Sequence, residues 1–174
     1  MVQLDDNNQF TPQASRPDMP EYGLLDADQG RGLLPWRWAQ ERLENSHNYW
    51  VATTRPDGRP HATAVWGVWW NNTFYFSSGR LARKARNLAH NPSCVLCIEN
   101  AAEAVIVEGV AQLISDSIVL EQLMQVYQAK YNSEYPAESN VYAVQPKVVF
   151  GFIEAAEEFS GSATRWKFTS GHGV

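Results

Sequence analysis

Residues 49–92, YWVATTRPDGRPHATAVWGVWWNNTFYFSSGRLARKARNLAHNP, decide the fold of this 174-residue chain. Three apolar runs rich in aromatic and β-branched residues are separated by RPDG at 55–58 and NN at 71–72. Both separators are turn sequences, because Pro presets φ and because Gly and Asn tolerate positive φ. The stretch therefore predicts three antiparallel strands followed by a helix that Pro92 stops. The expected buried stripe of this helix is Leu81, Ala85, Leu88 and Ala89.

The flanking segments continue the pattern. Residues 1–30 hold scattered Pro and Gly without an apolar period and predict an extended N-terminal arm, whereas 31–174 form one domain. Pro35 starts a short amphipathic helix, and the longest helix is expected over 116–130. Further strands are predicted in SCVLCIE, AEAVIVEGVAQLI, VYAVQP, KVVFGFIE and ATRWKF. Six or seven antiparallel strands without a βαβ rhythm indicate a mainly β, α+β domain whose sheet closes into a barrel.

Composition excludes several classes of protein. A net charge of -5 argues against nucleic-acid binding, which needs a clustered excess of Lys and Arg. Neither a signal peptide nor 18 consecutive apolar residues is present, so we expect no membrane partner and a cytoplasmic protein. Cys94 and Cys97 lie three apart in a predicted strand and should face opposite sides, which favours structural thiols over a redox or metal pair.

One polar constellation stands out, in the absence of esterase, zinc-protease, Walker and dinucleotide motifs and of metal-ligand spacing among the four histidines. Ser77 and Ser78 end a strand, and Arg83, Lys84 and Asn87 follow in a helix. Two hydroxyls, the free amides of a helix N-terminus and two cations suit a phosphomonoester. A solvated basic face with a routine Ser-Ser-Gly cap explains the same residues equally well.

The neighbouring strand is a second candidate. His61 and Thr63 could face the same groove as Ser77, and the small Ala62 and Ala64 leave room beside a flat ring. For His61 alone, a structural or surface role is the simpler interpretation.

At these residues the chain closely resembles the FMN-binding split-barrel superfamily, which includes pyridoxamine 5'-phosphate oxidases and deazaflavin-dependent reductases. The most specific likeness is FYFSSG...ARKARNLAHNP, with looser likeness in VIVEG, Lys130-Tyr131 and ATRWKF. The resemblance implies an antiparallel split β-barrel with flanking helices over 31–174, bound FMN and a homodimer. The cofactor contacts that it implies are His61, Thr63, Ala64, Val65, Trp66, Phe76, Ser77, Ser78, Arg83, Lys84, Arg165 and Trp166, the last two from the partner subunit.

The chain also departs from the oxidases. Pro60-His61 and apolar residues occupy the strand where the oxidases carry an Arg and a Lys, and the C-terminal vitamin-binding motif is not evident. We therefore expect an FMN-binding oxidoreductase of this family acting on another small molecule, with no catalytic residue identified from sequence. Trp66, Trp69 and Trp166 are candidate walls of a substrate cleft, with core or interface packing as the alternative. A deazaflavin-dependent reductase and a non-enzymatic flavin-binding or sensing protein remain the competing interpretations.

Overall fold

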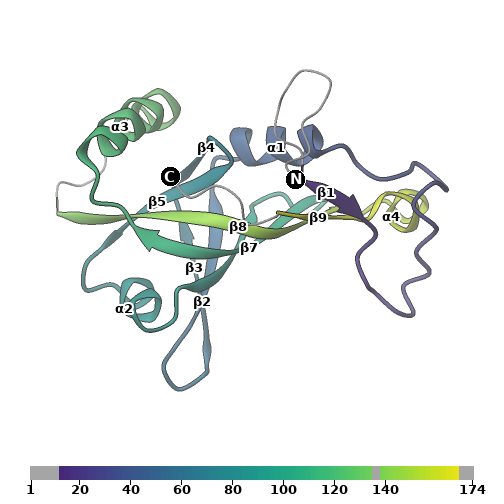
Figure 1. Ribbon diagram of the computed structural model, residues 1–174, viewed down its shortest axis with the longest axis horizontal. Helices are drawn as coiled ribbons and strands as arrows, with labels where there is room; N and C mark the ends of the chain where they lie inside the picture. Colours follow the sequence, from purple (N-terminus) through teal and green to yellow (C-terminus); the bar gives the residue numbers. More distant parts are fainter. Residues whose placement is uncertain (1–11, 135–137, 169–174) are drawn as a thin grey trace.

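The computed structural model describes residues 12–134 and 138–168, which form nine strands and four helices (Figure 1). The strands are β1 (Gln13–Ser15), β2 (Tyr49–Thr54), β3 (Pro60–Val65), β4 (Gly67–Trp70), β5 (Thr73–Gly79), β6 (Ser93–Ile98), β7 (Glu103–Leu113), β8 (Ser139–Ile153) and β9 (Thr164–Lys167). The helices are α1 (Trp36–Asn45), α2 (Arg83–His90), α3 (Ser117–Tyr131) and α4 (Ala156–Ser162).

The antiparallel sheet is organised around the 15-residue strand β8. β8 pairs with β7 from Tyr142 to Ile153 and with β5 from Ser139 to Val144, so two halves of the sheet diverge from it. One half continues through β7, β6, β2 and β3, and the other consists of β5 and β4. Within the described residues β3 and β4 do not pair, so the barrel is unclosed there. The predicted mainly β, α+β split-barrel fold with flanking helices is confirmed.

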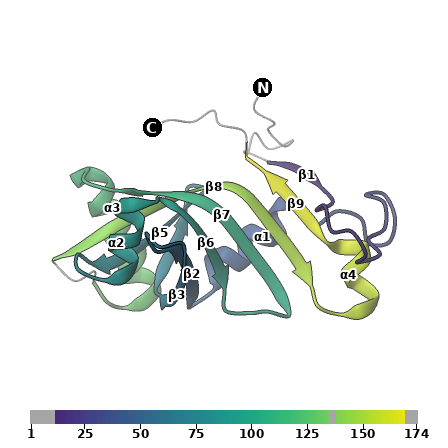
Figure 2. The same cartoon turned by 90° about the horizontal axis from the view of Figure 1, so that it is seen from below.

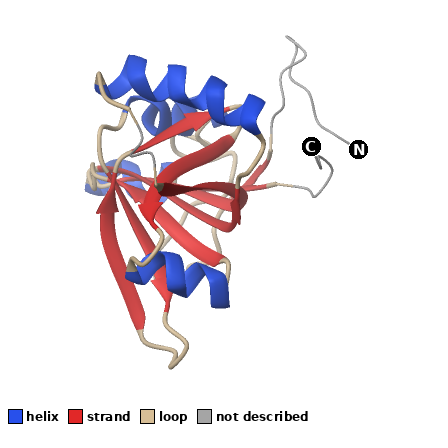
Figure 3. Cartoon of the chain, turned by 90° about the vertical axis from the view of Figure 1, so that its left-hand side faces the viewer, coloured by secondary structure: helices blue, strands red, loops and turns tan. Residues whose placement is uncertain are grey.

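Helices lie on both sides of the strands (Figure 3). α2 and α3 lie near one end of β8, and α4 lies near the other, as Figure 2 shows. α1 packs into the barrel core through Trp36, Ala39 and Leu43, the apolar side expected from sequence.

The structure has nine strands where six or seven were expected. One reason is that the segment 60–70 bends at Trp66, so that β3 pairs with β2 whereas β4 pairs with β5. Gly67 is required at this bend, because a Cβ there would lie 2.3 Å from the Phe74 ring. A second reason is the short polar strand β1, which lies in the predicted arm and pairs with β9. The N-terminal part of that arm, residues 1–11, lies outside the described residues, as does the Gly-His-Gly tail.

The predicted turns have the expected backbone. Gly58 has φ of 82°, and Asn71 and Asn72 have φ of 49° and 56°, as a tight hairpin turn requires. VYAVQP and KVVFGFIE form one strand, β8, rather than two. Pro146 lies at a register shift in which Glu108 pairs with Val148 and Gly109 with Pro146, so that Lys147 is an extra residue on β8. Such an irregularity tolerates a proline within a strand.

Strand register divides the side chains into two faces. An inner row crosses six strands through Thr63, Val51, Leu96, Val107, Val149 and Trp166, and its last five side chains are 0% exposed. The adjacent outer row consists of Ala64, Trp50, Cys97, Ile106, Phe150 and Arg165, all exposed or half-buried. The inner row forms the core, since burying a large apolar side chain contributes roughly 1.5–3 kcal/mol. The outer row leaves an apolar stripe on the opposite face.

Two helices differ from expectation. α2 begins at Arg83, so Leu81 precedes the helix and is 87% exposed; its predicted place on the buried stripe is wrong, and Ala89 is exposed as well. α3 begins beside Asp116, whose carboxylate accepts from the amides of Ile118 and Val119 at 2.8 and 3.3 Å. α4 was not predicted, since its sequence AEEFSGS contains weak helix formers. No described helix is long and apolar enough to cross a membrane.

Candidate functional site

The N-terminus of α2 is an uncapped helix end that begins with two cations. β5 ends at Gly79, and a turn closed by Ala82 N–H donating to the Gly79 carbonyl (3.0 Å) leads into α2. Ala82 occupies the N-cap without a capping side chain, and the first turn carries Arg83 and Lys84 rather than an acidic residue. The helix dipole disfavours cations at this end, and free amides point outward there. Both features fit a bound anion.

Two further basic side chains, Arg55 and the titratable His61, come from the β2–β3 hairpin. Partial burial, together with the positive charges of Arg55, Lys84 and Arg83, lowers the pKa of His61 below its usual range. Burial alone lowers the pKa of Lys84. Segments 30 residues apart in sequence therefore bring their positive groups together. We call Arg55, His61, Arg83 and Lys84 the cation cluster.

No ion pair within 12–134 and 138–168 involves a member of the cation cluster. The acidic group that interacts with Arg55 is Asp57, whose carboxylate is already paired with Arg59 and whose pKa is lowered first by Arg59 and further by Arg55. The Nε atom of Arg55 and the Nδ1 atom of His61 are buried without a hydrogen-bond partner in that part of the chain. Leaving buried polar atoms unpaired costs about 1–3 kcal/mol each. A ligand that accepts hydrogen bonds and carries negative charge would satisfy both.

Asn87 joins α2 to the hairpin. It is fully buried, and its Nδ2 donates to the Thr53 hydroxyl at 2.9 Å. Thr53 lies directly opposite His61 in the β2–β3 register. This hydrogen bond therefore sets the position of α2 relative to His61, a positioning role that sequence spacing alone did not reveal.

The predicted residues of β3 fall on both faces of the strand. His61 and Thr63 are half-buried and Val65 is buried, whereas Ala64 is exposed and Trp66 is 44% exposed. β3 pairs only with β2 among the described strands, so its other edge presents free backbone groups. The exposed alanines make this edge accessible to a flat ligand.

At the end of β5 the predicted side chains are less accessible. Phe76 is fully buried in the core, and only its backbone is available to a ligand. Ser78 is buried, with its hydroxyl 3.3 Å from the Gly79 carbonyl, whereas Ser77 is half-buried. α2 packs against both β5 and β2, which brings these serines near the cation cluster.

Arg165 and Trp166 have opposite orientations on β9. Arg165 belongs to the outer row, and its Nε donates to the Ser15 hydroxyl at 3.2 Å. Trp166 belongs to the inner row, is 0% exposed and packs edge-on against Trp36. The Trp166 side chain therefore has no surface to offer a cofactor, because adjacent strand residues face opposite sides.

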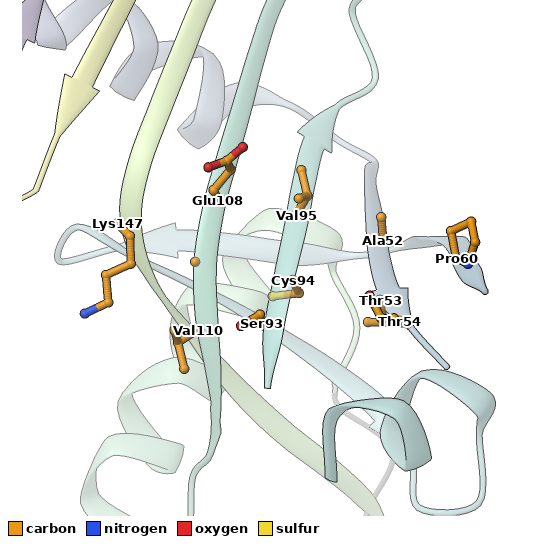
Figure 4. A pocket seen from close by; sticks show the side chains of 11 residues that line it. Ala52, Thr53, Thr54, Pro60, Ser93, Cys94, Val95, Glu108, Val110 and Lys147 are labelled. Atoms are coloured by element: carbon orange, nitrogen blue, oxygen red, sulfur yellow. The ribbon is translucent and has the colours of Figure 1, made fainter. Parts of the chain in front are cut away.

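A hollow of about 410 Å³ lies on the sheet beside Thr53 and Pro60 (Figure 4). It is lined by Ala52, Thr53, Thr54, Pro60, Ser93, Cys94, Val95, Glu108, Gly109, Val110 and Lys147. Burial raises the pKa of Cys94 to about 12 and also raises that of Cys97, so neither thiol is an activated nucleophile. Cys94 is buried and Cys97 half-buried, with no bond between them, and the described residues hold no cluster of three metal ligands.

Sequence reasoning missed Arg55, which was assigned only to the turn. The strand register would have pointed to Arg55. Thr53 pairs with His61 in the hairpin, and Arg55 follows Thr53 by two residues. Without the register, nothing distinguished it from the exposed Arg59.

The profile of the pyridoxamine 5'-phosphate oxidase family matches residues 37–156. The chain belongs to this family. The match spans α1 to the start of α4 and so includes the cation cluster and β3. A search of curated proteins gave no match.

Solved structures of the same fold have varied descriptions. An F420 reductase superposes with a TM-score of 0.53 at 24% identity, covering 63% of this chain and 94% of its own. The heme storage protein HutZ from Vibrio cholerae gives 0.54 at 20% identity, covering 64% and 86%. A conserved hypothetical protein from Mycobacterium tuberculosis gives 0.62 at 18% identity, covering 79% and 91%. At these identities the likeness shows the fold alone, so the ligand of this family member has to be argued from its own residues.

Proposed function

We propose that this member of the pyridoxamine 5'-phosphate oxidase family binds FMN along β3 and acts as an oxidoreductase on a small molecule. The observation that carries the proposal is the cation cluster, which has two buried nitrogens without a hydrogen-bond partner and forms no ion pair in the described chain. The phosphate of FMN fits these residues, because a phosphomonoester carries negative charge and accepts hydrogen bonds.

The phosphate is held where α2 begins. Arg83 and Lys84 supply charge, the amides of the first helical turn donate hydrogen bonds, and His61 approaches from β3. Asn87 keeps these elements together through Thr53. The site therefore combines positive charge with backbone donors fixed by the fold.

The ring lies along the free edge of β3. From His61 to Trp66 is five residues, about 16 Å along an extended strand, a span comparable to an extended FMN molecule. Ala62 and Ala64 are exposed and present no bulky side chain to a planar ring. Free backbone groups at this edge suit the donors and acceptors of the pyrimidine portion of a flavin.

Bound FMN supplies the electron-transfer chemistry, which no side chain of the protein can replace. The residues of the chain bind the phosphate, orient the ring and limit water on one face. This division of labour is consistent with a site built from cations and small residues.

We further propose that the protein is a homodimer whose interface is the outer row. This row runs as an apolar stripe from Ala64 to Phe150 and includes Trp50, which is 52% exposed. A second copy would bury the stripe and bring the partner's Arg165 to the cofactor. Light scattering should give twice the mass of one chain, and Ile106→Glu in this row should halve it. A wild-type mass equal to one chain would contradict the dimer.

A deazaflavin is the second candidate, favoured by the F420 reductase of the same fold and by the exposed Arg80 and Arg86 beside the cation cluster. Its longer acidic tail needs such additional cations.

The deciding experiment is a visible spectrum of freshly purified protein, with mass identification of the chromophore released on denaturation. Where no chromophore is retained, titration of the protein with FMN and with the deazaflavin gives the two affinities. FMN bound at micromolar affinity or better supports the proposal, whereas preference for the deazaflavin replaces it with the second candidate. Bound FMN that NADH and NADPH both fail to reduce, or whose reduced form transfers no electrons to any acceptor, would indicate a flavin-binding or sensing protein.

A further inference from the structure

Trp66 occupies a distinctive position between β3 and β4. Its ring is 44% exposed, and one face stacks on Tyr131 from the end of α3, with centroids 4.8 Å apart and planes 7° from parallel. The His47 ring meets Trp66 and Tyr131 edge-on at 5.8 and 5.2 Å. An aromatic ring supported on one face is thus left accessible beside the free edge of β3.

Tyr131 is itself fixed to the bend. Its hydroxyl accepts from the Gly67 N–H at 3.0 Å and lies 2.8 Å from the carbonyl oxygens of both Gly67 and His47. The Tyr131 ring under Trp66 is therefore anchored through its hydroxyl to the backbone of two segments, at His47 and at Gly67. Holding an aromatic ring in place before a ligand arrives reduces the ordering cost of binding.

Lys130, which precedes Tyr131, is already engaged by the protein. Lys130 Nζ donates to the Tyr49 hydroxyl at 2.7 Å and to the carbonyl oxygens of Glu44 and Gly67 at 3.1 and 3.2 Å. These three acceptors match its three N–H donors. Lys130 therefore has no donor left for an anionic ligand, in contrast to the cation cluster.

The other tryptophans suggested by the sequence cannot play this part. Trp69 is 5% exposed and Trp166 is 0% exposed, and both pack against Trp36 in the core. Only Trp66 among these three presents a ring face.

We propose that Trp66 is a stacking platform for a planar, uncharged aromatic ring of the substrate. The inference rests on the proposed function, which places the flavin beside Trp66 along β3. It goes further by assigning the substrate an uncharged ring, because the Lys130 ammonium and the Tyr131 hydroxyl beside Trp66 are already engaged by acceptors and donors of the protein. A phosphate-bearing substrate would have to displace one of the three acceptors of Lys130 to pair with that cation.

The test measures binding of menadione, an uncharged naphthoquinone, to FMN-loaded protein by equilibrium dialysis and by tryptophan fluorescence quenching. Trp66→Leu keeps apolar packing on Tyr131 but removes the aromatic face, whereas Trp66→Phe keeps a smaller one. Tyr22→Ala is the matched control, because Tyr22 is another exposed aromatic with a ring neighbour, Phe159, and lies outside the site. Thermal unfolding checks that each variant is folded.

We expect Trp66→Leu to weaken menadione binding about tenfold, as loss of one aromatic stack does, and Trp66→Phe to weaken it about threefold or less. Tyr22→Ala should leave the affinities for menadione and for FMN unchanged, and Trp66→Leu should weaken menadione binding more than FMN binding. Equal menadione affinity in Trp66→Leu and wild type, or no binding to wild type, overturns the platform. A parallel loss of FMN affinity in Trp66→Leu overturns it too, by assigning the ring to the flavin itself. Failure of wild type to bind FMN overturns the proposed function instead, and menadione binding to the free protein then decides the platform separately.

Discussion

Arg16 and the cation cluster differ in how far the surrounding chain compensates their positive charge. Arg16 lies at the C-terminal end of α4, where carbonyl groups and the helix dipole favour a cation. Arg83 and Lys84 lie at the N-terminal end of α2, where both disfavour one. The chain provides hydrogen-bond acceptors for Arg16, whereas the start of α2 provides no acidic residue and no capping side chain for Arg83 and Lys84.

The surroundings of Arg16 show what a satisfied cation looks like. Its guanidinium donates to the carbonyl oxygens of Ala163 (2.8 Å), Leu25 (3.0 Å), Gly161 (3.0 Å), Asp26 (3.1 Å), Gln29 (3.2 Å) and Gly32 (3.5 Å). These contacts fasten the loop before α1 to the C-terminal end of α4. In the cation cluster, by contrast, Arg55 Nε and His61 Nδ1 are buried without an acceptor within the described residues. Satisfied charge stabilises the fold, and unsatisfied charge indicates a ligand.

The largest expected effect is on stability, at Arg16. Arg16→Ala leaves six carbonyls without their donor. It should lower the free energy of unfolding by about 3–4 kcal/mol, because hydrogen bonds to charged groups are worth about 1.5–3 kcal/mol each and water replaces the donor at the exposed carbonyls. Urea denaturation measures this. Arg16→Lys, which keeps the charge without the planar fork, should recover only part of the loss. Unchanged stability in Arg16→Ala would show that water replaces the guanidinium and that the comparison is mistaken.

The next effect is on ligand binding, at Lys84. Lys84→Glu places a negative charge against the proposed phosphate and should weaken FMN binding about 100-fold, or about 2.8 kcal/mol. Arg86→Glu is the matched control, since it makes the same charge change at an exposed position of the same helix and should cost threefold or less. Isothermal titration of both proteins with FMN gives the comparison. Equal losses of FMN affinity in the two variants would mean that Lys84 acts by long-range electrostatic attraction and does not contact the phosphate.

Much of the fold follows from local signals in the sequence. The turns at Gly58 and at Asn71-Asn72, the apolar side of α1 and the Asp116 cap of α3 all depend on neighbours within a few residues. The failures depend on tertiary contacts. β1 has no apolar pattern and exists because β9 offers a partner, and Leu81 precedes α2 because the chain turns at Gly79 before the helix starts.

The candidate site could be predicted only in part. Arg83 and Lys84 were visible as a basic pair after a strand, but their convergence with Arg55 and His61 needs the hairpin register and the packing of α2. Trp166 was paired with Arg165 in the prediction, yet strand alternation places it in the core. Whether a residue faces in or out depends on register, which one sequence does not fix.

A smaller effect on stability distinguishes Lys84 from Arg16 in the protein without FMN. Lys84→Met removes a charge that burial already disfavours, as the lowered pKa of Lys84 shows, and keeps a similar apolar stem. It should raise the free energy of unfolding by about 1 kcal/mol while weakening FMN binding. Urea denaturation without FMN tests the sign. Destabilisation comparable to Arg16→Ala would mean that Lys84 is structural.

The smallest effect concerns proton uptake at His61. Its pKa is lowered in the free protein by burial and by Arg55, Lys84 and Arg83, and a bound phosphate should raise it. The contribution of charged His61 to FMN binding is then fully present below the pKa of the free protein and is lost as pH rises through the pKa of the complex. The phosphate also titrates, so the informative quantity is the ratio of wild-type affinity to that of His61→Asn, in which the phosphate effect cancels. This ratio should grow about threefold from about pH 8 to about pH 6. A ratio independent of pH would place His61 outside the phosphate site and leave Arg83 and Lys84 as its charged contacts.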